Sequence, residues 1–265
     1  MKLFAGLFLL LAVAPAAFAK LEITNVQPAH GMLGPVRDSD DVYPLDEYVV
    51  RFQLNGVKTT AEGKTDCELA IRLVNAAGKA VVDTKATLQR VMSLGGDSVP
   101  TFAVVTFPAV APAGEYKLTV SVRDRVASET ASLERKLTCK TGEFHLLAPR
   151  FTHDPEGKIP AGTTGVAGES LYFRFKVAGY DKSKKLSLTM KAEVLDSAGK
   201  PVDAKPIIAN ADTTDPEKLA SLIQANFTGT LALNRVGEFK LKITVEDNVA
   251  KKTVTFETPV KVLAP

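Results

Sequence analysis

The sequence predicts an all-β protein that consists of two tandem antiparallel β-sandwiches, with one short helix in the second. Apolar residues make up 45% of the 265 residues and charged residues 24%, which is the composition of an ordinary globular protein. Several segments alternate apolar and polar residues, a pattern typical of strands that bury one face. Four blocks of sequence also occur twice in the same order, and such an internal repeat indicates a duplicated domain.

The first 19 residues have the layout of a secretory signal peptide. A positive residue, Lys2, precedes the apolar run "LFAGLFLLLAVAPAAF", and the small-x-small sequence at 17–19 comes directly before Lys20. The run is shorter than the ~20 residues that a membrane-spanning helix needs, and Pro15 interrupts it, which argues against a membrane anchor. We therefore expect cleavage near Ala19 and export of a soluble mature protein, without a membrane span, to the periplasm or the extracellular space.

The repeat with the highest similarity consists of "GEYKLTVSVRDRVA" from Gly114 and "GEFKLKITVEDNVA" from Gly237, 123 residues apart. In both copies apolar residues alternate with polar or charged ones, and this spacing predicts a strand with one face in a core. A helix with these sequences would place lysines in the core, because its buried face needs apolar residues at spacings of three and four. The residues expected to face the core are Tyr116, Leu118, Val120 and Val122 in the first copy and Phe239, Leu241, Ile243 and Val245 in the second.

Three further blocks precede and follow this repeat. "YVVRFQLNGV" (Tyr48–Val57) aligns with "LYFRFKVAGY" (Leu171–Tyr180), and "RLVNAAGKAV" aligns with "AEVLDSAGKPV". The last block, "LTCKTGEFHLLAP" (Leu137–Pro149), aligns with "VTFETPVKVLAP" (Val254–Pro265). The offset between the copies changes from block to block, as loop insertions between matched strands would produce. Each copy then contains about seven short strands, and we expect β-sandwich domains at 20–148 and 149–265 after the signal peptide.

One short helix is predicted in the second domain. The segment "TTDPEKLASLIQ" offers Asp215 as N-cap and Pro216 in the first turn, two residues that favour the start of a helix. Leu219, Leu222 and Ile223 would share one apolar face of this helix. The first copy has "QRVMSLGGDSVP" in the same place, so we expect this connection to differ between the domains.

The repeated strand resembles a strand of known bacterial exported modules. "GEYKLTVSVRD" and "GEFKLKITVED" are similar to the G-x-Y-x-L-x-V-x-V-x-D penultimate strand of bacterial immunoglobulin-like and fibronectin-III-like domains. "LVNAAGKAVV" and "VLDSAGKPVD" resemble the L-x-D-x-x-G-K-x-V hairpin of the same modules. The resemblance covers most of both copies after residue 45 and implies an immunoglobulin-like fold. It implies a role in surface layers, adhesion, carbohydrate binding or spacing, and a shared fold does not choose among these.

Two cysteines, Cys67 and Cys139, fall in the first copy at positions that we expect to face its core. Their counterparts in the alignment, Leu188 and Phe256, are apolar residues of the second copy. Because export would permit oxidation, we hypothesise a disulfide between Cys67 and Cys139. It would close a loop of about 70 residues and contribute roughly 3–4 kcal/mol in the chain-entropy model. The alternative is two buried thiols that act as small apolar groups.

Acidic residues at two places are candidates for other roles. In "RDSDDVYPLDE" the carboxylates of Asp38, Asp40 and Asp41 could contribute to a calcium site, although calcium needs about six to eight oxygens from several segments. The alternative is a solvated loop, and the second copy has "GTTGVAGES" here instead. Asp124 and Asp247 each end the repeated strand, where an aspartate can accept hydrogen bonds from the backbone of the following turn. We therefore assign these two a structural, turn-capping role.

No arrangement of residues in the sequence predicts catalysis. His30, His145 and His153 are not spaced as metal ligands, and the chain contains no GxSxG, HExxH or glycine-rich phosphate-binding sequence. We expect His145 to point outward from the last strand of the first copy, opposite Lys261 of the second. The net charge of +3, with acids and bases mixed along the chain, does not indicate a nucleic-acid surface. We expect no enzymatic activity, no cofactor and no nucleic-acid partner.

These observations predict an exported, non-catalytic structural or interaction protein of the cell envelope or the extracellular space. Its partner would be an envelope or extracellular protein or a polysaccharide. One alternative is a glycan- or ligand-binding module, with its site at the domain junction or on the loops at one end. Another is a two-domain periplasmic chaperone-like binder that lends an edge strand to its partners. Because the two copies share what the fold requires, a specific function should lie where they differ, at 38–47, 125–136 and 215–224.

Overall fold

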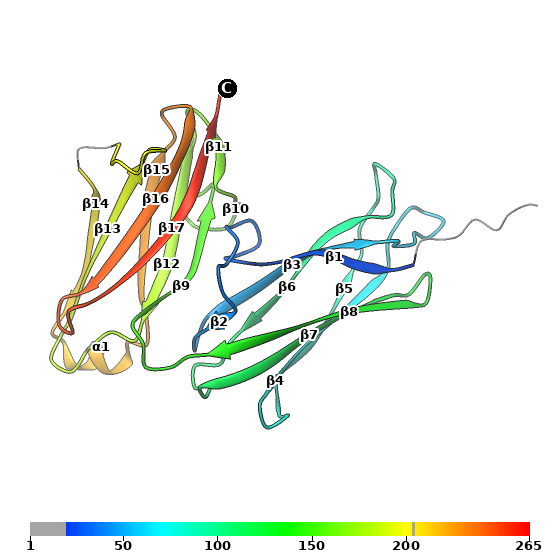
Figure 1. Ribbon diagram of the computed structural model, residues 1–265, viewed down its shortest axis with the longest axis horizontal. Coiled ribbons are helices and arrows are strands. Elements are labelled where there is room, and N and C mark those ends of the chain that lie inside the picture. The colour runs from blue at the N-terminus through cyan, green and yellow to red at the C-terminus, as the bar shows by residue number, and fades with distance from the viewer. Residues whose placement is uncertain (1–19, 203–204) are drawn as a thin grey trace, which may run out of the picture.

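The computed structural model describes residues 20–202 and 205–265, and Figure 1 shows two β-sandwich halves that meet near the middle of the molecule. Each half has its own buried apolar core, and nearly all of the regular structure is strand. The predicted all-β class, with two tandem sandwiches and one short helix, is therefore confirmed. Among the described residues, no helix is long and apolar enough to cross a membrane. The predicted signal peptide at 1–19 lies outside the described residues.

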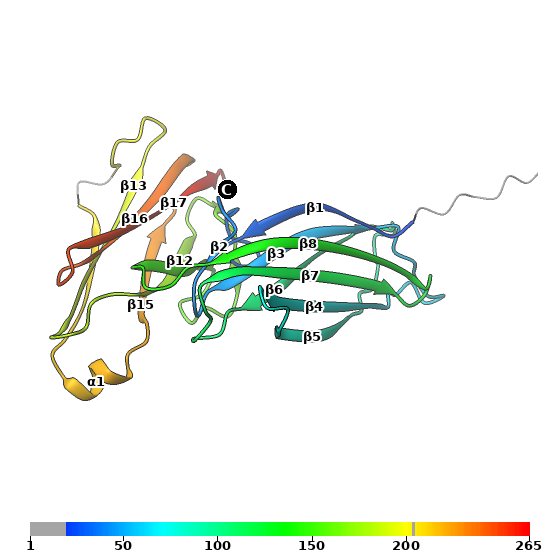
Figure 2. The same cartoon turned by 60° about the horizontal axis from the view of Figure 1, so that its bottom comes forward.

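The first half, residues 21–139, consists of two facing sheets. One sheet has the strand order β1-β3-β6 and the other the order β2-β8-β7-β4-β5. Figure 2 shows β8, β7, β4 and β5 side by side along this half. Neighbouring strands are antiparallel except β2, which runs parallel to β8. The strands are β1 (Glu22–Ala29), β2 (Asp41–Val42), β3 (Glu47–Asn55), β4 (Cys67–Asn75), β5 (Ala80–Leu88), β6 (Val99–Thr106), β7 (Gly114–Asp124) and β8 (Glu129–Cys139).

The second half, residues 145–263, repeats this arrangement. Its sheets have the orders β10-β9-β12-β15 and β11-β17-β16-β13-β14, and β11 runs parallel to β17 as β2 does to β8. Apart from the added β10, the strand order is that of the first half, so the duplication read from the sequence is present in the fold. The strands are β9 (His145–Thr152), β10 (Pro160–Ala161), β11 (Thr164–Val166), β12 (Ser170–Ala178), β13 (Leu186–Leu195), β14 (Ile207–Thr213), β15 (Ala225–Ala232), β16 (Gly237–Asp247) and β17 (Lys252–Leu263).

The repeated strand is β7 in the first half and β16 in the second, and each lies in the middle of its five-stranded sheet. Leu118 and Val120 of β7 are fully buried, as are Leu241 and Val245 of β16. The polar residues between them lie on the opposite face of the sheet, where solvent reaches them. The spacing of two therefore places the apolar residues in the two cores, as expected for strands with one wet face.

The short helix is α1 (Pro216–Ser221), and it begins as the sequence predicts. The Asp215 carboxylate accepts hydrogen bonds from the backbone N–H groups of Glu217 and Lys218, which is the geometry of an N-cap. Leu219 is buried against the second core, whereas the side chain of Ile223, beyond the end of the helix, is 62% exposed. The apolar face of the helix is therefore narrower than predicted, because the helix ends after one and a half turns.

The pairing of the last strands corrects the alignment of the fourth block. Gly114 of β7 pairs with Cys139, and the equivalent Gly237 of β16 pairs with Val262. The counterpart of Cys139 is therefore Val262 and not Phe256, and no insertion separates the last two blocks. A shift by an even number of residues keeps every side chain on its face of the sheet, so alternation alone cannot determine the register.

The strand β9 also differs from the prediction. His145 pairs with Ala178 and Leu147 with Lys176 of β12, so the strand opens the second half instead of closing the first. The His145 side chain is buried, and the expected outward position opposite Lys261 is wrong. The predicted domain boundary after residue 148 falls inside β9, and we propose that the second domain begins near His145.

Side chains from both halves pack at the junction. The ring of Tyr43, in the loop after β2, stacks on the ring of His145 with 3.9 Å between their centroids. The ring of His30, which follows β1, meets Phe256 of β17 edge-on at 5.4 Å. The connection between β8 and β9 contains only residues 140–144. Short connections and packed rings restrict the relative motion of neighbouring domains.

Candidate functional site

The two cysteines do not form the disulfide that we hypothesised. Cys67 pairs with Asp124 at one end of β7, and Cys139 pairs with Gly114 at the other end. These ends are ten residues apart, roughly 33 Å along a strand, whereas a disulfide needs Cα atoms within about 7 Å. Both thiols are free and buried, and the hypothesis is wrong. The hypothesis rested on both cysteines facing the same core. The sequence does not show that the two positions lie at opposite ends of the sheet.

The acidic loop does not assemble the predicted calcium site. Asp38 is exposed, the Asp40 carboxylate accepts hydrogen bonds from the Tyr48 hydroxyl and from Arg135, and Asp41 forms an ion pair of 2.5 Å with Lys140. Within the part of the chain that the structure describes, no three His, Cys, Asp or Glu side chains converge to hold a metal ion. The carboxylates of Asp40 and Asp41 are neutralised by separate bases, so they fasten the loop to β3, to β8 and to Lys140 directly after β8.

Asp124 and Asp247 occupy equivalent, fully buried positions at the ends of β7 and β16. The Asp124 carboxylate accepts backbone hydrogen bonds from Lys58 at 2.7 Å, Val126 at 2.8 Å and Ala127 at 3.1 Å. The Asp247 carboxylate accepts the equivalent bonds, from Asp181 at 2.7 Å, Val249 at 2.9 Å and Ala250 at 3.0 Å. Each aspartate thus caps the turn after its strand and ties it to the loop after β3 or β12.

The three histidines differ in their surroundings. His145 Nδ1 lies 2.7 Å from the backbone carbonyl of Glu143, and burial lowers the pKa of His145. Burial and the nearby charge of Arg37 lower the pKa of His30 to about 3, so His30 is neutral at physiological pH. His153 is exposed. Among the described residues, none of the three histidine rings forms a hydrogen bond with a carboxylate or a hydroxyl side chain.

The structure instead shows a surface that the sequence did not predict, which we call the junction groove. Two adjoining hollows of about 480 and 230 Å³ run along the outer face of the β1-β3-β6 sheet toward the second half. Met32, Leu33 and Phe102 line both hollows, so they form one continuous groove. Gln53 lines the end in the first half, and Arg150 of β9 lines the end at the junction.

The junction groove carries more positive than negative charge. Arg51, Arg90 and Arg150 line it together with a single acid, Glu47, which lies 3.6 Å from Arg150. The Arg51 guanidinium donates a hydrogen bond to the backbone carbonyl of Gly34 and so holds the loop after β1 against the sheet. Arg51 and Arg90 form no ion pair within the described residues. The junction groove thus combines the apolar floor of Met32, Leu33 and Phe102 with an excess of positive charge.

The strand β6 forms one edge of the groove. It pairs with β3 on one side only, so its other side presents unpaired backbone N–H and C=O groups. Its sequence, VPTFAVVT, contains no charged residue, although charges are a common protection of exposed edges. Phe102 and Val104 of this strand are half-buried and face the groove. An uncharged edge beside a groove is suited to the addition of an extended segment.

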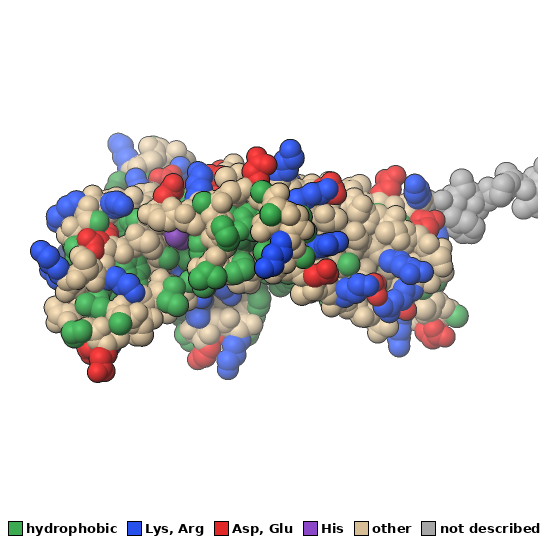
Figure 3. Space-filling model, turned by 90° about the horizontal axis from the view of Figure 1, so that it is seen from below, with side chains coloured by type: hydrophobic (Ala, Val, Ile, Leu, Met, Phe, Trp, Pro, Cys, Tyr) green, Lys and Arg blue, Asp and Glu red, His purple; other side chains and the backbone are tan. Residues whose placement is uncertain are grey.

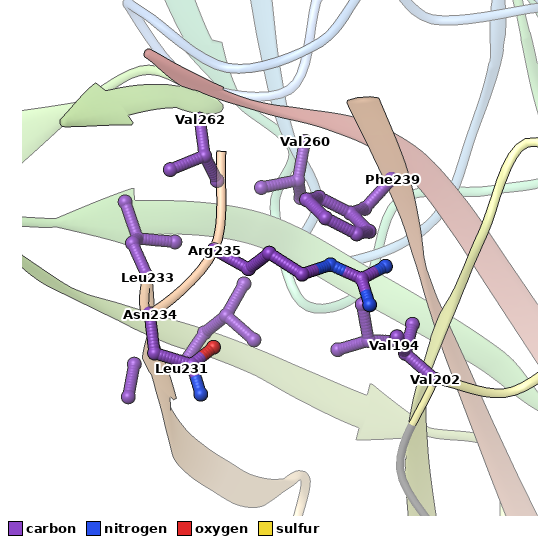
Figure 4. Close-up of a pocket in the computed structure, with 10 residues that line it drawn as sticks. Val194, Val202, Leu231, Leu233, Asn234, Arg235, Phe239, Val260 and Val262 are labelled. Atoms are coloured by element: carbon purple, nitrogen blue, oxygen red, sulfur yellow. The ribbon is translucent and has the colours of Figure 1, made fainter. Parts of the chain in front are cut away.

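A separate pocket, which we call the distal pocket, lies between the two sheets of the second half. Its volume is about 350 Å³, and its apolar wall includes Val194, Leu231, Val260 and Val262. In Figure 4 the Arg235 side chain lies across this pocket with its guanidinium beneath the ring of Phe239. On the face of the molecule that Figure 3 shows, acidic and basic side chains are interspersed, and hydrophobic side chains gather near the middle.

Comparison with known proteins adds little to this description. No protein-family model and no curated protein matches the chain in sequence. Among solved structures, the chain is similar to the C-terminal domain of the AgI/II polypeptide BspA from Streptococcus agalactiae. The identity is 13%, the match covers 91% of this chain and 99% of that chain, and the TM-score is 0.28. A likeness of this extent does not indicate a function for this chain.

Proposed function

We propose that the protein is an exported, non-catalytic interaction protein that binds an extended, acidic segment of an envelope or extracellular protein. Export rests on the predicted signal peptide. The observation that carries the binding role is the junction groove, where an uncharged edge strand lies beside an apolar floor with an excess of arginine.

The groove favours binding by strand addition. An extended segment alongside β6 would pair with its free N–H and C=O groups, which supply affinity without regard to sequence. Apolar side chains of the segment would cover Phe102 and Val104, and acidic ones would reach Arg51 and Arg90. Specificity would come from these side chains, because the backbone contacts are the same for every peptide.

The packed junction supports a preformed site. Loop residues Met32 and Leu33 belong to the segment that begins at His30, whose ring contacts Phe256 in the second half. The groove therefore spans both halves and exists before any partner binds. A preformed groove loses less conformational entropy on binding than one that has to assemble.

A glycan is the second candidate ligand, because amide side chains line the same groove. Asn25, Gln27 and Gln53 lie there beside Phe102, and amides next to an aromatic ring can bind sugar hydroxyls. The Asn25 amide already donates a hydrogen bond of 2.9 Å to Gln53, so part of this capacity is used within the protein. This internal bond is why we prefer the peptide.

The test uses the chain from residue 20 and three labelled ten-residue peptides, followed by fluorescence anisotropy. One peptide repeats Val-Thr-Glu-Thr, which puts valine and glutamate on the same face of an extended strand, as Phe102 and its pairing partner Arg51 require. A second peptide has lysine in place of glutamate, and a third is glycine-serine. We expect saturable binding of the valine-glutamate peptide alone, weakened by salt because exposed charges are screened. Equal binding of the lysine peptide would contradict the proposal. Binding on a glycan array, with no peptide binding, would establish the second candidate instead.

Two matched variants locate the binding surface. Val104→Asp places a charge on β6 and in the groove, and we expect at least about tenfold weaker binding of the acidic peptide. Val110→Asp makes the same change in the β6–β7 connection, at a side chain that is 88% exposed and does not line the groove. The proposal requires the second variant to bind as the unmodified protein does, and an equal loss in both would overturn it.

A further inference from the structure

The distal pocket can be compared with the same place in the first half, where side chains fill the space. Between β6 and β7, the ring of Phe107 meets Tyr116 edge-on at 5.3 Å. The Tyr116 hydroxyl donates a hydrogen bond of 3.0 Å to the carbonyl of Pro112, the arrangement known as a tyrosine corner. Ala111, within the connection between these strands, is buried as well. The end of the first sandwich is therefore closed.

In the second half the same three closing features are missing. The pairings of Thr106 with Glu47 and of Ala232 with Ser170 make Leu233 the counterpart of Phe107. Phe239 replaces Tyr116, so the hydroxyl of the tyrosine corner is absent. The connection between the strands has four residues, 233–236, in place of the seven at 107–113. Smaller side chains and a shorter loop leave the distal pocket open.

The open space has the size of a small-molecule site. Its volume of about 350 Å³ is at the lower end of the range for ligand pockets, and it would hold on the order of ten carbon atoms, since a water molecule occupies roughly 30 Å³. Apolar side chains from both sheets line it, among them Val194 and Leu231, and Val202 and Leu233 line it from two connections. The apolar side chains of this lining favour an apolar group, and Asn234 and Arg235 add polar groups to it.

The shorter connection also introduces a charge. Among the residues that the structure describes, Arg235 is the only charged one that lines the distal pocket, and the connection at 107–113 contains none. Its guanidinium lies 5.0 Å from the centre of the Phe239 ring, which holds it over the apolar wall (Figure 4). Within the described residues Arg235 forms no ion pair with a carboxylate. Its five N–H donors are therefore available to an anion from outside.

We propose that the distal pocket binds a small amphipathic carboxylate. The apolar part, a chain or ring of about eight to ten carbons, would lie among the valine and leucine side chains. The carboxylate would stay at the mouth and pair with the Arg235 guanidinium, whose planar fork matches two carboxylate oxygens. This site lies in the second half only and is independent of the junction groove.

The test is a titration with decanoate, followed by heat of binding and by the methyl NMR signals of the valines and leucines. Decanol and decylammonium serve as neutral and cationic probes of the same length. We expect saturable binding of decanoate with shifts at Val194 and Val260, weaker binding of decanol, and the weakest binding of decylammonium. Equal binding of all three probes would contradict a role of Arg235, and shifts confined to other parts of the chain would overturn the site.

Three variants make the assignment specific. Arg235→Gln is expected to weaken decanoate binding by about tenfold and to leave decanol unchanged, because it removes only the charged hydrogen bonds. Val202→Phe, at a half-buried position in the wall, is expected to fill the pocket and to weaken the binding of both decanoate and decanol. Arg72→Gln, an exposed change in the first half, is the control and should change neither. If Arg235→Gln binds decanoate as well as the control does, the proposal fails, whatever the peptide experiment shows.

Discussion

At the scale of single residues, Asp124 and Asp247 concentrate more hydrogen bonds than any exposed carboxylate of the same strands. Each is fully buried, and each accepts three backbone N–H bonds that join a turn to a distant loop. A buried N–H group that loses its acceptor leaves the cost of its desolvation uncompensated. The two positions therefore control stability without belonging to a binding surface.

Replacing Asp124 by alanine is expected to lower the free energy of unfolding by about 3 kcal/mol or more, because three donors lose a charged acceptor at once. Asp124→Asn keeps one acceptor oxygen, so its free energy of unfolding should lie between those of the unmodified protein and of Asp124→Ala. Urea unfolding measures the difference. Asp83→Ala, whose carboxylate is 62% exposed, is the control and should change stability by less than about 0.5 kcal/mol. A loss for Asp124→Ala as small as that of the control would contradict the capping role.

The two thiols provide a second test at this scale. Burial, with the nearby carboxylate of Asp124, raises the pKa of Cys67 to about 11, and burial also raises the pKa of Cys139. Since the thiolate is the reactive form, we expect almost no reaction with a disulfide reagent in the folded protein at pH 8. In urea, without reductant, two thiols should react. A denatured, unreduced protein with no reactive thiol would contradict the separation of the cysteines along β7.

At the scale of elements, local sequence signals determine where α1 begins, and packing determines which of its side chains contribute to stability. The N-cap and the proline start the helix, Leu219 within it is buried in the core, and Leu222 at its C-cap packs partly against the core. We expect Leu219→Ala to lower the free energy of unfolding by about 2 kcal/mol and Ile223→Ala, in the same segment, by less than about 0.5 kcal/mol. Thermal unfolding of both variants measures the difference. Equal losses would mean that Ile223 packs against the protein in solution.

Elements whose signals are local could be predicted from the sequence. The alternation in β7 and β16 and the caps of α1 involve neighbouring residues, and all three elements form where expected. The register of β17 could not be predicted, because a shift by six residues keeps the same side chains inward. The segment His145–Pro149 looked like the end of one copy, and only its pairing with β12 assigns it to the next.

The candidate surfaces could not be predicted, because their residues come from distant segments. Gln27, Arg51, Phe102 and Arg150 meet in the junction groove only after the strands have paired, and none is unusual in the sequence alone. One signal was present: the run at 99–106 contains no charged residue, and Pro100 is its one residue of a kind that protects edge strands. For the distal pocket, the signal was the connection that is three residues shorter in the second copy.

At the scale of the whole molecule, His30 couples the packing of the junction to pH. The pKa of its ring is about 3 in the folded protein and about 6.5 when unfolded, because burial, with the Arg37 charge, disfavours the protonated form. A group whose pKa is lowered on folding contributes stability above the unfolded pKa, and this contribution is lost as the pH falls from about 6.5 toward 3. Acid should therefore weaken the junction.

The prediction is a melting temperature that falls between pH 7 and pH 4.5 in the unmodified protein and falls less in His30→Phe. Phenylalanine keeps a ring against Phe256 but has no proton to gain. His153→Phe, at an exposed histidine, is the control and should follow the unmodified protein. Parallel curves for the unmodified protein and His30→Phe would show that His30 does not respond to acid in this range.

The separation of the two cysteines has a consequence for experiments on folding. Cys67 lies at the free end of the first sandwich, and Cys139 lies six residues before the first residue of β9, at the junction. Each thiol becomes accessible only when its own end of the sheet opens, so the rate of labelling at each cysteine reports a different local opening. The natural chain thus contains two built-in probes of local opening, and the ratio of their labelling rates would show whether the junction or the free end opens more readily.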